Sequence, residues 1–303
     1  MLPKAQLMEQ TPGVHRGWRF PGLAVIVAAL FLSGVLVVLY PSTASWLNQY
    51  QQSEVLEGYS GELEQLPQSG LTEALARAAE YNAQLTGGAL VGSYRNIPDA
   101  SGVDSAPLGY SDQLSADESG LMARIKIPAI AVDLPIYHGT SDDVLLRGVG
   151  HLEGTALPIG GDGTHSVLTA HRGLAQSPLF TDLNNVQVGD RFVIEVYGEV
   201  LTYDVIQTQV VEPSETEALY PIANADLVTL VTCTPLGINS QRILVTGERV
   251  SPTPVADVAD LGEPPEIPGF PTWAVILGGA IMVLAAYIWL MGRPPRSRGR
   301  HEG

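Results

Sequence analysis

The stretch that decides the fold is Leu227-Val-Thr-Leu-Val-Thr-Cys233-Thr-Pro-Leu-Gly-Ile-Asn-Ser-Gln-Arg242-Ile-Leu-Val-Thr246. It holds two apolar runs rich in β-branched residues, 227–233 and 242–246, which is the composition of buried strands. The residues between them, 234–241, predict a loop. If the two strands pair, Cys233 and Arg242 lie at the same edge of a sheet.

Further short strands precede this pair along the chain. Alternating or apolar β-type patterns occur at 122–127, 131–137, 165–170, 191–197 and 200–211, and the last two predict a hairpin across Gly198-Glu199. A short helical turn over 141–147 has Ser141 as its cap. Several short strands with little helix between them predict an all-β barrel or sandwich.

Three residues at the ends of these runs have complementary chemistry. Cys233 is the only cysteine, so it cannot form an intramolecular disulfide, and at a strand end it is placed like a nucleophile. His171 follows the apolar run 166–170, and an imidazole can take the thiol proton and later return it to a leaving amine. Arg242 stays protonated at physiological pH and can stabilise the negative oxygen of a tetrahedral intermediate. Spacing alone does not prove that the three meet.

Two motifs resemble the signatures of the sortase family, most closely its class C, pilin-polymerising branch. They are Val167-Leu-Thr-Ala-His171-Arg-Gly173 and Leu230-Val-Thr-Cys233-Thr-Pro-Leu-Gly-Ile-Asn-Ser-Gln-Arg242, and the resemblance covers 121–250. It implies an eight-stranded β-barrel with short helices and a cysteine transpeptidase without a cofactor. It also implies His171 as the acid and base, Cys233 as the nucleophile, and Arg242 as the oxyanion or substrate stabiliser.

The resemblance further implies a substrate and an acceptor. A sorting signal of the Leu-Pro-x-Thr-Gly kind on a surface protein or pilin is cleaved between Thr and Gly, held as a thioester, and passed to an amine. For class C that amine is a pilin lysine, and for a housekeeping sortase it is the cell-wall peptide precursor. A membrane platform that binds pilins without chemistry is a further alternative, which the intact Cys, His and Arg set disfavours.

Each site residue also has a structural alternative: a buried thiol for Cys233, a satisfied core imidazole for His171 and a salt-bridge partner for Arg242. Thr169 shares a face with His171 and is a candidate for the groove, whereas Arg172 and Thr232 are expected on the opposite face. A metal site is not predicted, because His138, His151 and His165, with Glu153 and Asp162 nearby, match no familiar ligand spacing.

Two uncharged apolar segments, 21–40 and 271–291, are each long enough to cross a membrane, which takes about 20 residues. A cleaved signal peptide is the alternative for the first segment, and a buried core helix for the second. Lys4, Arg16 and Arg19 precede the first segment, and four arginines follow the second. Because positive residues stay inside, we expect a cytoplasmic N-terminus (1–20), a cytoplasmic basic tail (292–303) and everything between the two segments outside.

The outer portion divides by composition into four parts. We expect a pair of helices over 41–87, near Thr43–Gly58 and from after Thr72, then a lid-like loop over 88–120. The barrel over 121–250 follows, then a stiff, extended Pro-rich linker over 251–270. Class C lids often carry an Asp-Pro-aromatic motif, where this loop has Ile97-Pro98-Asp99-Ala100. Its larger apolar groups, which are candidates to cover the groove, include Tyr94, Ile97, Leu108 and Tyr110.

The net charge of the chain is −16. Between the two apolar segments nine Lys or Arg stand against thirty Asp or Glu, which gives about −21 (9 − 30). A surface of this sign has no basic stripe to neutralise phosphates, which argues against a nucleic-acid partner.

Overall fold

The computed structural model describes residues 18–85, 109–115, 119–265 and 268–293. The chain separates into two compact units, one formed by residues 41–269 and the other by the segments on either side of it. Each unit is described by itself.

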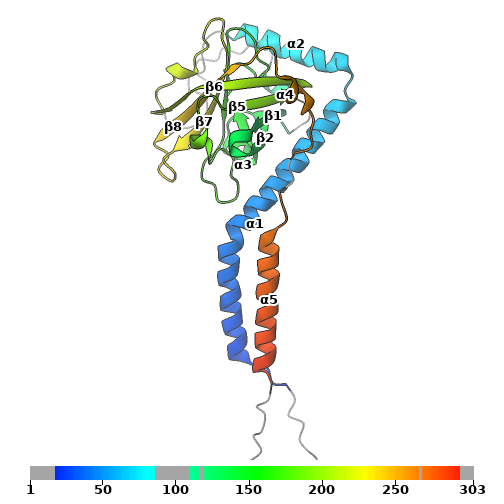
Figure 1. Cartoon of the computed structure of the whole chain (residues 1–303), viewed down its shortest axis with the longest axis vertical. Coiled ribbons are helices and arrows are strands. Elements are labelled where there is room, and N and C mark those ends of the chain that lie inside the picture. Colours follow the sequence, from blue (N-terminus) through cyan, green and yellow to red (C-terminus); the bar gives the residue numbers. More distant parts are fainter. Residues whose placement is uncertain (1–17, 86–108, 116–118, 266–267, 294–303) are drawn as a thin grey trace, which may run out of the picture. The chain divides into compact units, whose positions relative to one another are not determined.

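The larger unit is built on a closed barrel of eight strands (Figure 1). Neighbouring strands around the barrel follow the order β1-β2-β3-β4-β7-β8-β6-β5, which places β1 and β7 on opposite walls. The strands are β1 Leu121–Ile127, β2 Val132–His138, β3 Val149–His151, β4 Thr164–Thr169, β5 Arg191–Val196, β6 Glu199–Val211, β7 Asp226–Thr234 and β8 Gln241–Arg249. The all-β barrel expected from the sequence is confirmed.

Alternation along the strands divides the barrel into an inner and an outer face. On β7, Val228 and Leu230 belong to the main core, whereas Val231 belongs to a separate apolar cluster. That separate cluster also contains Leu244 of β8 and Val167 of β4, so it marks the outer face of these three strands. On β7, residues an even number of positions from Val231 therefore lie on the outer face, and the residues between them lie on the inner face.

Two helices precede the barrel, α1 Gly22–Gln65 and α2 Gln68–Gln84. The sequence predicted a new helix near Thr43, but α1 runs without a break through Pro41. A proline removes one backbone hydrogen bond, and the turns on both sides of Pro41 remain helical. Helix α2 starts at Gln68, before the predicted position, and its buried residues recur at helical spacing to join the barrel core: Leu71, Ala74, Ala78 and Tyr81.

The segment after β8, residues 251–265, is called the strap here. A stiff extended linker was predicted, but the strap contains a short helix, α4 Val255–Ala259, and is hydrogen-bonded to the barrel. Asp257 accepts a hydrogen bond from Thr202 at 2.7 Å, and Lys126 donates to the backbone carbonyl of Asp260 at 3.1 Å. Pro254 precedes the first turn, where a proline is compatible with a helix start.

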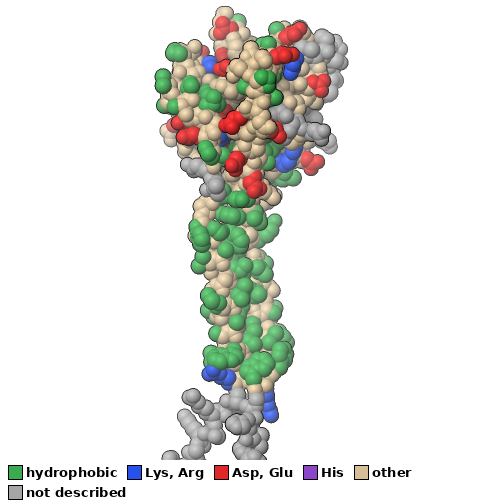
Figure 2. Space-filling model, turned by 90° about the vertical axis from the view of Figure 1, so that its right-hand side faces the viewer, with side chains coloured by type: hydrophobic (Ala, Val, Ile, Leu, Met, Phe, Trp, Pro, Cys, Tyr) green, Lys and Arg blue, Asp and Glu red, His purple; other side chains and the backbone are tan. Residues whose placement is uncertain are grey.

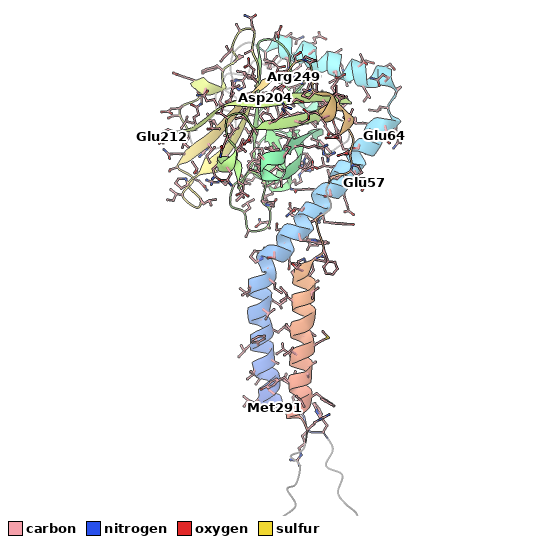
Figure 3. All side chains as sticks on the ribbon, in the orientation of Figure 1. Glu57, Glu64, Asp204, Glu212, Arg249 and Met291 are labelled. Atoms are coloured by element: carbon pink, nitrogen blue, oxygen red, sulfur yellow. The ribbon has the colours of Figure 1, made fainter. Side chains whose placement is uncertain are left out.

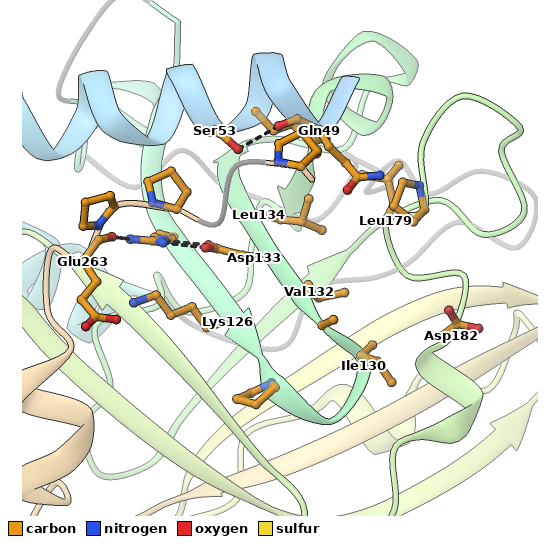
Figure 4. A pocket seen from close by; sticks show the side chains of 18 of the residues that line it. Gln49, Ser53, Lys126, Ile130, Val132, Asp133, Leu134, Leu179, Asp182 and Glu263 are labelled. Atoms are coloured by element: carbon orange, nitrogen blue, oxygen red, sulfur yellow. Dashed lines mark hydrogen bonds and ion pairs between the residues drawn. The ribbon is translucent and has the colours of Figure 1, made fainter. Parts of the chain in front are cut away.

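A buried arginine joins the strap to the outer face of β1. The guanidinium of Arg124 donates to both carboxylate oxygens of Asp133 at 2.6 and 2.5 Å, and to the carbonyl of Glu263 at 2.7 Å. Its side chain is 2% exposed, and Glu195 lies 3.5 Å away. Figure 4 shows the adjoining cleft of about 560 Å³, with Lys126 and Asp133 among its lining residues. The lining of this cleft includes none of the three candidate catalytic residues.

The smaller unit holds two apolar helical segments, the first part of α1 and α5 Thr272–Met291. By length and composition both helices are able to cross a membrane. Figure 2 shows hydrophobic side chains covering these segments, with Lys or Arg side chains at one end. At that end the indole of Trp18 donates to the carbonyl of Trp289 at 3.3 Å, and the amide of Arg19 donates to Gly292 at 2.9 Å.

The surface of the larger unit carries many carboxylates (Figure 2). Glu57 and Glu64 of α1 and Glu212 at the end of β6 are exposed (Figure 3). Acidic side chains on several separate elements agree with the excess of Asp and Glu counted from the sequence.

Candidate active site

Strands β7 and β8 place Cys233 directly opposite Arg242. The two strands are antiparallel, and the register pairs Cys233 with Arg242 and Thr234 with Gln241. The connecting loop is therefore shorter than predicted, because Thr234 and Gln241 belong to the strands. Residues directly opposite each other in an antiparallel pair have side chains on the same face, with Cβ atoms about 4.5–5.5 Å apart.

Strand β4 brings His171 to the same end of the sheet. It runs parallel to β7, with Thr169 beside Val231, and the amide of Ala170 donates to the carbonyl of Val231 at 3.2 Å. The hydroxyl of Thr232 donates back to the carbonyl of Ala170 at 2.8 Å. His171 is the next residue, so it continues the register towards Cys233.

All three candidate residues belong to the outer face by their position in the alternation. Cys233 is two residues from Val231, Arg242 is two residues from Leu244, and both Val231 and Leu244 are in the outer apolar cluster. Cys233 is a free thiol, and all three residues are half-buried. The structural alternative of a fully buried thiol therefore does not fit Cys233.

The surroundings of His171 favour its neutral form. Burial lowers the pKa of His171, and the nearby carboxylate of Asp142 offsets part of this effect. Asp142 lies in the first turn of α3, Asp142–Arg147, which immediately precedes β3. Because β3 pairs with β4, this helix is brought near the end of β4. A neutral imidazole is the form that can accept a proton from a thiol.

Arg242 is oriented by backbone carbonyls and not by a carboxylate. Its Nη1 donates to the carbonyls of Asn239 and Gln241, both at 3.0 Å. Within the described part of the chain, no carboxylate lies within ion-pair distance of Arg242. The salt-bridge alternative therefore has no support here, and the charge of the guanidinium is not neutralised by a neighbouring acid.

Arg172 supports the site, although no role was predicted for it. Its guanidinium donates to the carbonyl of Thr181 at 2.9 Å, to the hydroxyl of Thr234 at 2.9 Å and to Asn184 Oδ1 at 2.7 Å. Thr234 follows Cys233 directly, so Arg172 fixes the end of β7 to the loop after β4. These contacts are consistent with the prediction that Arg172 lies on the face opposite to His171. The only signal in the sequence that Arg172 supports the site was its position next to His171.

Gly173 allows the loop after His171 to approach the β7–β8 loop closely. Its φ is +78°, and a Cβ atom at this position would lie 2.5 Å from Cδ2 of Leu236. A residue with a side chain would therefore be strained twice, by its backbone conformation and by this contact.

The threonines flanking the site differ in what they do. Thr169 is on the face expected for it but is only 4% exposed, and its hydroxyl has no hydrogen-bond partner among the described residues. Thr232 is 1% exposed, and its hydroxyl donates to the carbonyl of Ala170. Both facts agree with the prediction that Thr232 lies on the face opposite to Cys233.

The remaining histidines have separate structural partners. His151 is fully buried between the hydroxyl of Tyr110 at 2.8 Å and the carbonyl of Ala156 at 2.9 Å, and burial lowers its pKa to about 4. His138 lies between the carbonyls of Gly120 and Gln113. Among the described residues, no group of three or more His, Cys, Asp or Glu is arranged to hold a metal ion.

Most of the predicted lid lies outside the described residues, including Tyr94, Ile97 and Leu108. Tyr110 is described, and it packs against the rings of His138 and His151. Its hydroxyl also accepts a hydrogen bond from the amide of Gly139 at 3.0 Å. These contacts fix Tyr110 against β2 and β3, so this side chain is not available to occupy a peptide groove.

Comparison with known proteins gives consistent matches to one family. A family model described as the sortase domain matches residues 125–250. Sortase A of Bacillus anthracis is 27% identical over 152 residues, which are 50% of this chain and 70% of that protein. Sortase D of Bacillus subtilis is 30% identical over 131 residues, which are 42% of this chain and 63% of that protein.

Solved structures extend the similarity over a larger share of the chain. The crystal structure of sortase C-1 from Actinomyces oris is 44% identical, with a TM-score of 0.54, and the match covers 59% of this chain and 98% of that one. Sortase C1 from Streptococcus agalactiae is 39% identical, with a TM-score of 0.60, and the match covers 66% and 100% of the two chains.

Proposed function

This chain belongs to the sortase family of cysteine transpeptidases, and on that basis we propose that it is a membrane-anchored pilin polymerase of the class C kind. It cleaves a Leu-Pro-x-Thr-Gly-like sorting signal between Thr and Gly, holds the acyl group as a thioester on Cys233, and transfers it to a pilin lysine. The observation that carries this proposal is the direct pairing of Cys233 with Arg242 beside the end of β4 that leads to His171.

The proposed roles follow from the chemistry of each group. Neutral His171 accepts the thiol proton, and the Cys233 thiolate then attacks the carbonyl carbon of the Thr–Gly bond. Arg242 stabilises the negative oxygen that develops in the tetrahedral intermediate. Collapse of the intermediate breaks the C–N bond, and His171 returns its proton to the leaving glycine amine.

The second half of the reaction reverses these steps with a different amine. The incoming lysine must be neutral to attack the thioester, and His171 accepts its surplus proton as the new amide bond forms. The Cys233 thiolate leaves and is reprotonated. Cys233 is half-buried on the outer face of the barrel, so the proposed amine on a separate protein approaches the thioester from outside the barrel.

The pilin acceptor rests on the solved structures and on the elements around the barrel. Several of the matched structures are class C sortases, and that of sortase C from Streptococcus pneumoniae is described as giving insight into pilin substrate specificity. A helix pair before the barrel and a second apolar helix after it also favour class C. The curated relatives include two sortases A and a sortase D, whose names specify no acceptor, so a housekeeping enzyme that uses the cell-wall peptide precursor is the alternative proposal.

Anchoring in the membrane is part of the same proposal. The apolar part of α1 and helix α5 are both long enough to span a bilayer, and basic residues flank each of them on the side away from the barrel in the sequence. By the positive-inside rule both termini are cytoplasmic and residues 41–269 are outside.

Mass spectrometry of the full chain in detergent, incubated with a set of sorting peptides, tests the enzyme class and the motif together. We expect an acyl adduct on Cys233 for at least one peptide of the Leu-Pro-x-Thr-Gly kind, and no adduct in Cys233→Ala. A chain that binds these peptides without cleaving them would instead be a non-catalytic platform.

The acceptor is tested by adding amines to the acylated enzyme. A lysine-containing pilin domain should discharge the thioester faster than a cell-wall precursor peptide presented at the same concentration. The opposite order would identify the housekeeping reaction and contradict the class C assignment.

A further inference from the structure

His165, near the start of β4, lies on the same outer face as the site and has two well-defined partners. Its Nδ1 is 3.0 Å from the backbone carbonyl of Tyr220, and its Nε2 is 2.7 Å from the hydroxyl of Thr229. The Thr229 hydroxyl is in turn 2.9 Å from that of Thr246. His165 is 3% exposed and Thr229 is fully buried, so their contact is shielded from water, whereas the contact with the exposed residue Tyr220 is part-buried.

The partners of His165 determine where its proton lies. A carbonyl only accepts hydrogen bonds, so Nδ1 carries the hydrogen that is donated to Tyr220. Nε2 then accepts from the Thr229 hydroxyl, which accepts in turn from Thr246. Burial lowers the pKa of His165, with the Tyr220 hydrogen bond acting in the opposite direction, so the neutral ring is favoured.

Tyr220 belongs to the segment between β6 and β7, residues 212–225, called the β6–β7 segment here. Leu219, the preceding residue, is 8% exposed and packs in the outer apolar cluster with Val231 and Leu244. Val231 and Leu244 form the outer-face pair next to Cys233 and Arg242, roughly 7 Å along the strands. The β6–β7 segment is therefore held over the outer face directly beside the site.

The same segment has a second attachment near Arg242. At its start, Glu212 accepts a hydrogen bond from Gln241 at 2.9 Å, and Gln241 is the residue before Arg242. This contact is exposed and contributes little on its own. The hydrogen bond from His165 to Tyr220 is part-buried, so it is the better shielded of the two polar attachments, and it lies next to the apolar anchor of Leu219.

We propose that His165 is a positioning residue for the sorting signal: by donating to the Tyr220 carbonyl it holds the β6–β7 segment as a wall of the groove that leads to Cys233. The proposal rests on the sortase reaction proposed above, since the peptide that this wall would contact is the substrate of that reaction. His165 does not touch the reacting atoms. Its loss weakens peptide binding and leaves the chemistry of Cys233 unchanged.

Two substitutions separate this role from a purely structural one. Asn places its amide nitrogen where Nδ1 of histidine lies, so His165→Asn keeps the donor to Tyr220 and loses the contact with Thr229. Gln reaches the position of Nε2, so His165→Gln keeps the contact with Thr229 and loses the donor to Tyr220. Asn also leaves more empty volume than Gln, so packing alone predicts that His165→Asn is the more damaging substitution.

The experiment measures cleavage of Leu-Pro-x-Thr-Gly peptides by the full chain in detergent. We expect His165→Gln to raise KM about fivefold, the effect of losing one net hydrogen bond, with kcat changed less than twofold. His165→Asn should keep KM near the wild-type value despite a lower melting temperature. Labelling of Cys233 by a small thiol reagent should be the same in all three proteins.

Hydrogen exchange supplies a measurement that needs no substrate. Backbone amides of the β6–β7 segment should exchange faster in His165→Gln than in the wild type, and not in His165→Asn. If no peptide is cleaved, the proposed function fails, and the exchange result still decides whether His165 holds this segment. The inference is overturned if His165→Gln matches the wild type in both KM and exchange. It is also overturned if the changes in KM and exchange follow the loss of stability, so that His165→Asn is the more affected variant.

Discussion

Among the single side chains of the site, Arg242 presents a guanidinium whose Nη1 is already held by the carbonyls of Asn239 and Gln241. In the proposed mechanism, the other nitrogens of this rigid, planar fork are the ones that face the substrate. A lysine keeps the charge but not the fixed donor geometry. We therefore expect the contribution of Arg242 to the proposed reaction to depend on orientation as well as on charge.

Arg242→Lys is expected to lower kcat/KM by about 10²–10³, which is the cost of losing one oxyanion donor in a preorganised site. Cys233→Ala supplies the baseline, with neither cleavage nor thioester formation. Peptide cleavage rates and thermal melts of both variants check this prediction. A lysine variant that retains more than about a tenth of the wild-type activity would show that Arg242 contributes only its charge.

His151 should make stability depend on pH in a defined window. Its pKa is lowered by burial from 6.5 to about 4, so the unfolded chain binds a proton that the folded chain does not. The free energy of unfolding is then unaffected above pH 6.5, falls as the pH drops from 6.5 to 4, and has lost roughly 3 kcal/mol by the lower limit.

His151→Gln checks this prediction, because glutamine does not titrate and can still donate to Ala156. Urea unfolding at pH 7 and pH 5 should show a larger stability loss for the wild type than for the variant. Equal losses in the two proteins would assign the acid sensitivity to other groups.

At the scale of strands and loops, the loop after β4 and the loop after β7 approach each other closely at Gly173 and Leu236. Gly173→Ala is expected to destabilise this junction by about 1–2 kcal/mol through its left-handed backbone alone. It should also lower kcat about tenfold or more, since small displacements of catalytic groups have large effects. The measurements are kcat and the melting temperature.

The double variant Gly173→Ala/Leu236→Ala is the matched control for that substitution. Truncating Leu236 removes the close contact with the new Cβ but not the backbone strain. We expect partial recovery of kcat with little recovery of stability. If the double variant is no better than Gly173→Ala, the contact with Leu236 does not position His171.

The strands around the site were predictable because their patterns are strong, whereas other elements were decided by tertiary contacts. Leu227–Cys233 and Arg242–Thr246 read as strands from composition, and both lie within observed strands. Strand β3 was missed because three residues, Val149–His151, are too short to show alternation. The prolines of the strap predicted an extended spacer. The sequence does not show that Arg124 and Lys126 of β1 donate hydrogen bonds to backbone carbonyls of the strap.

The candidate site was predictable to a similar extent. Cys233 and Arg242 follow from two adjacent runs, and their register confirms the expected edge. The role of Asp142 was not predictable, because it depends on the short strand β3 that brings α3 beside β4. Arg172 was set aside on strand alternation, which gives the face of a side chain but not the partners it reaches there.

Across the barrel as a whole, Arg124 of β1, which binds the end of the strap, and Cys233 of β7 are on opposite walls. Arg124→Met should therefore affect stability much more than chemistry. It leaves Asp133 without its ion-pair partner and Glu195 with Lys126 alone, and it removes the donor to the strap carbonyl, for an expected loss of about 3–5 kcal/mol. Urea unfolding measures that loss, and thiol labelling of Cys233 under native conditions should be unchanged. A loss below about 1 kcal/mol would mean that the strap is bound mainly by its other contacts.

The position of Cys233 on the outside of a closed barrel also limits how a substrate can approach. A site inside the barrel would admit only a chain end, and its product would have to be threaded out again. On an outer wall the bound segment can lie sideways, with folded protein on either side of it. In the proposed polymerisation, the growing product therefore never has to pass through the enzyme, so its length sets no steric limit on the number of successive joining reactions.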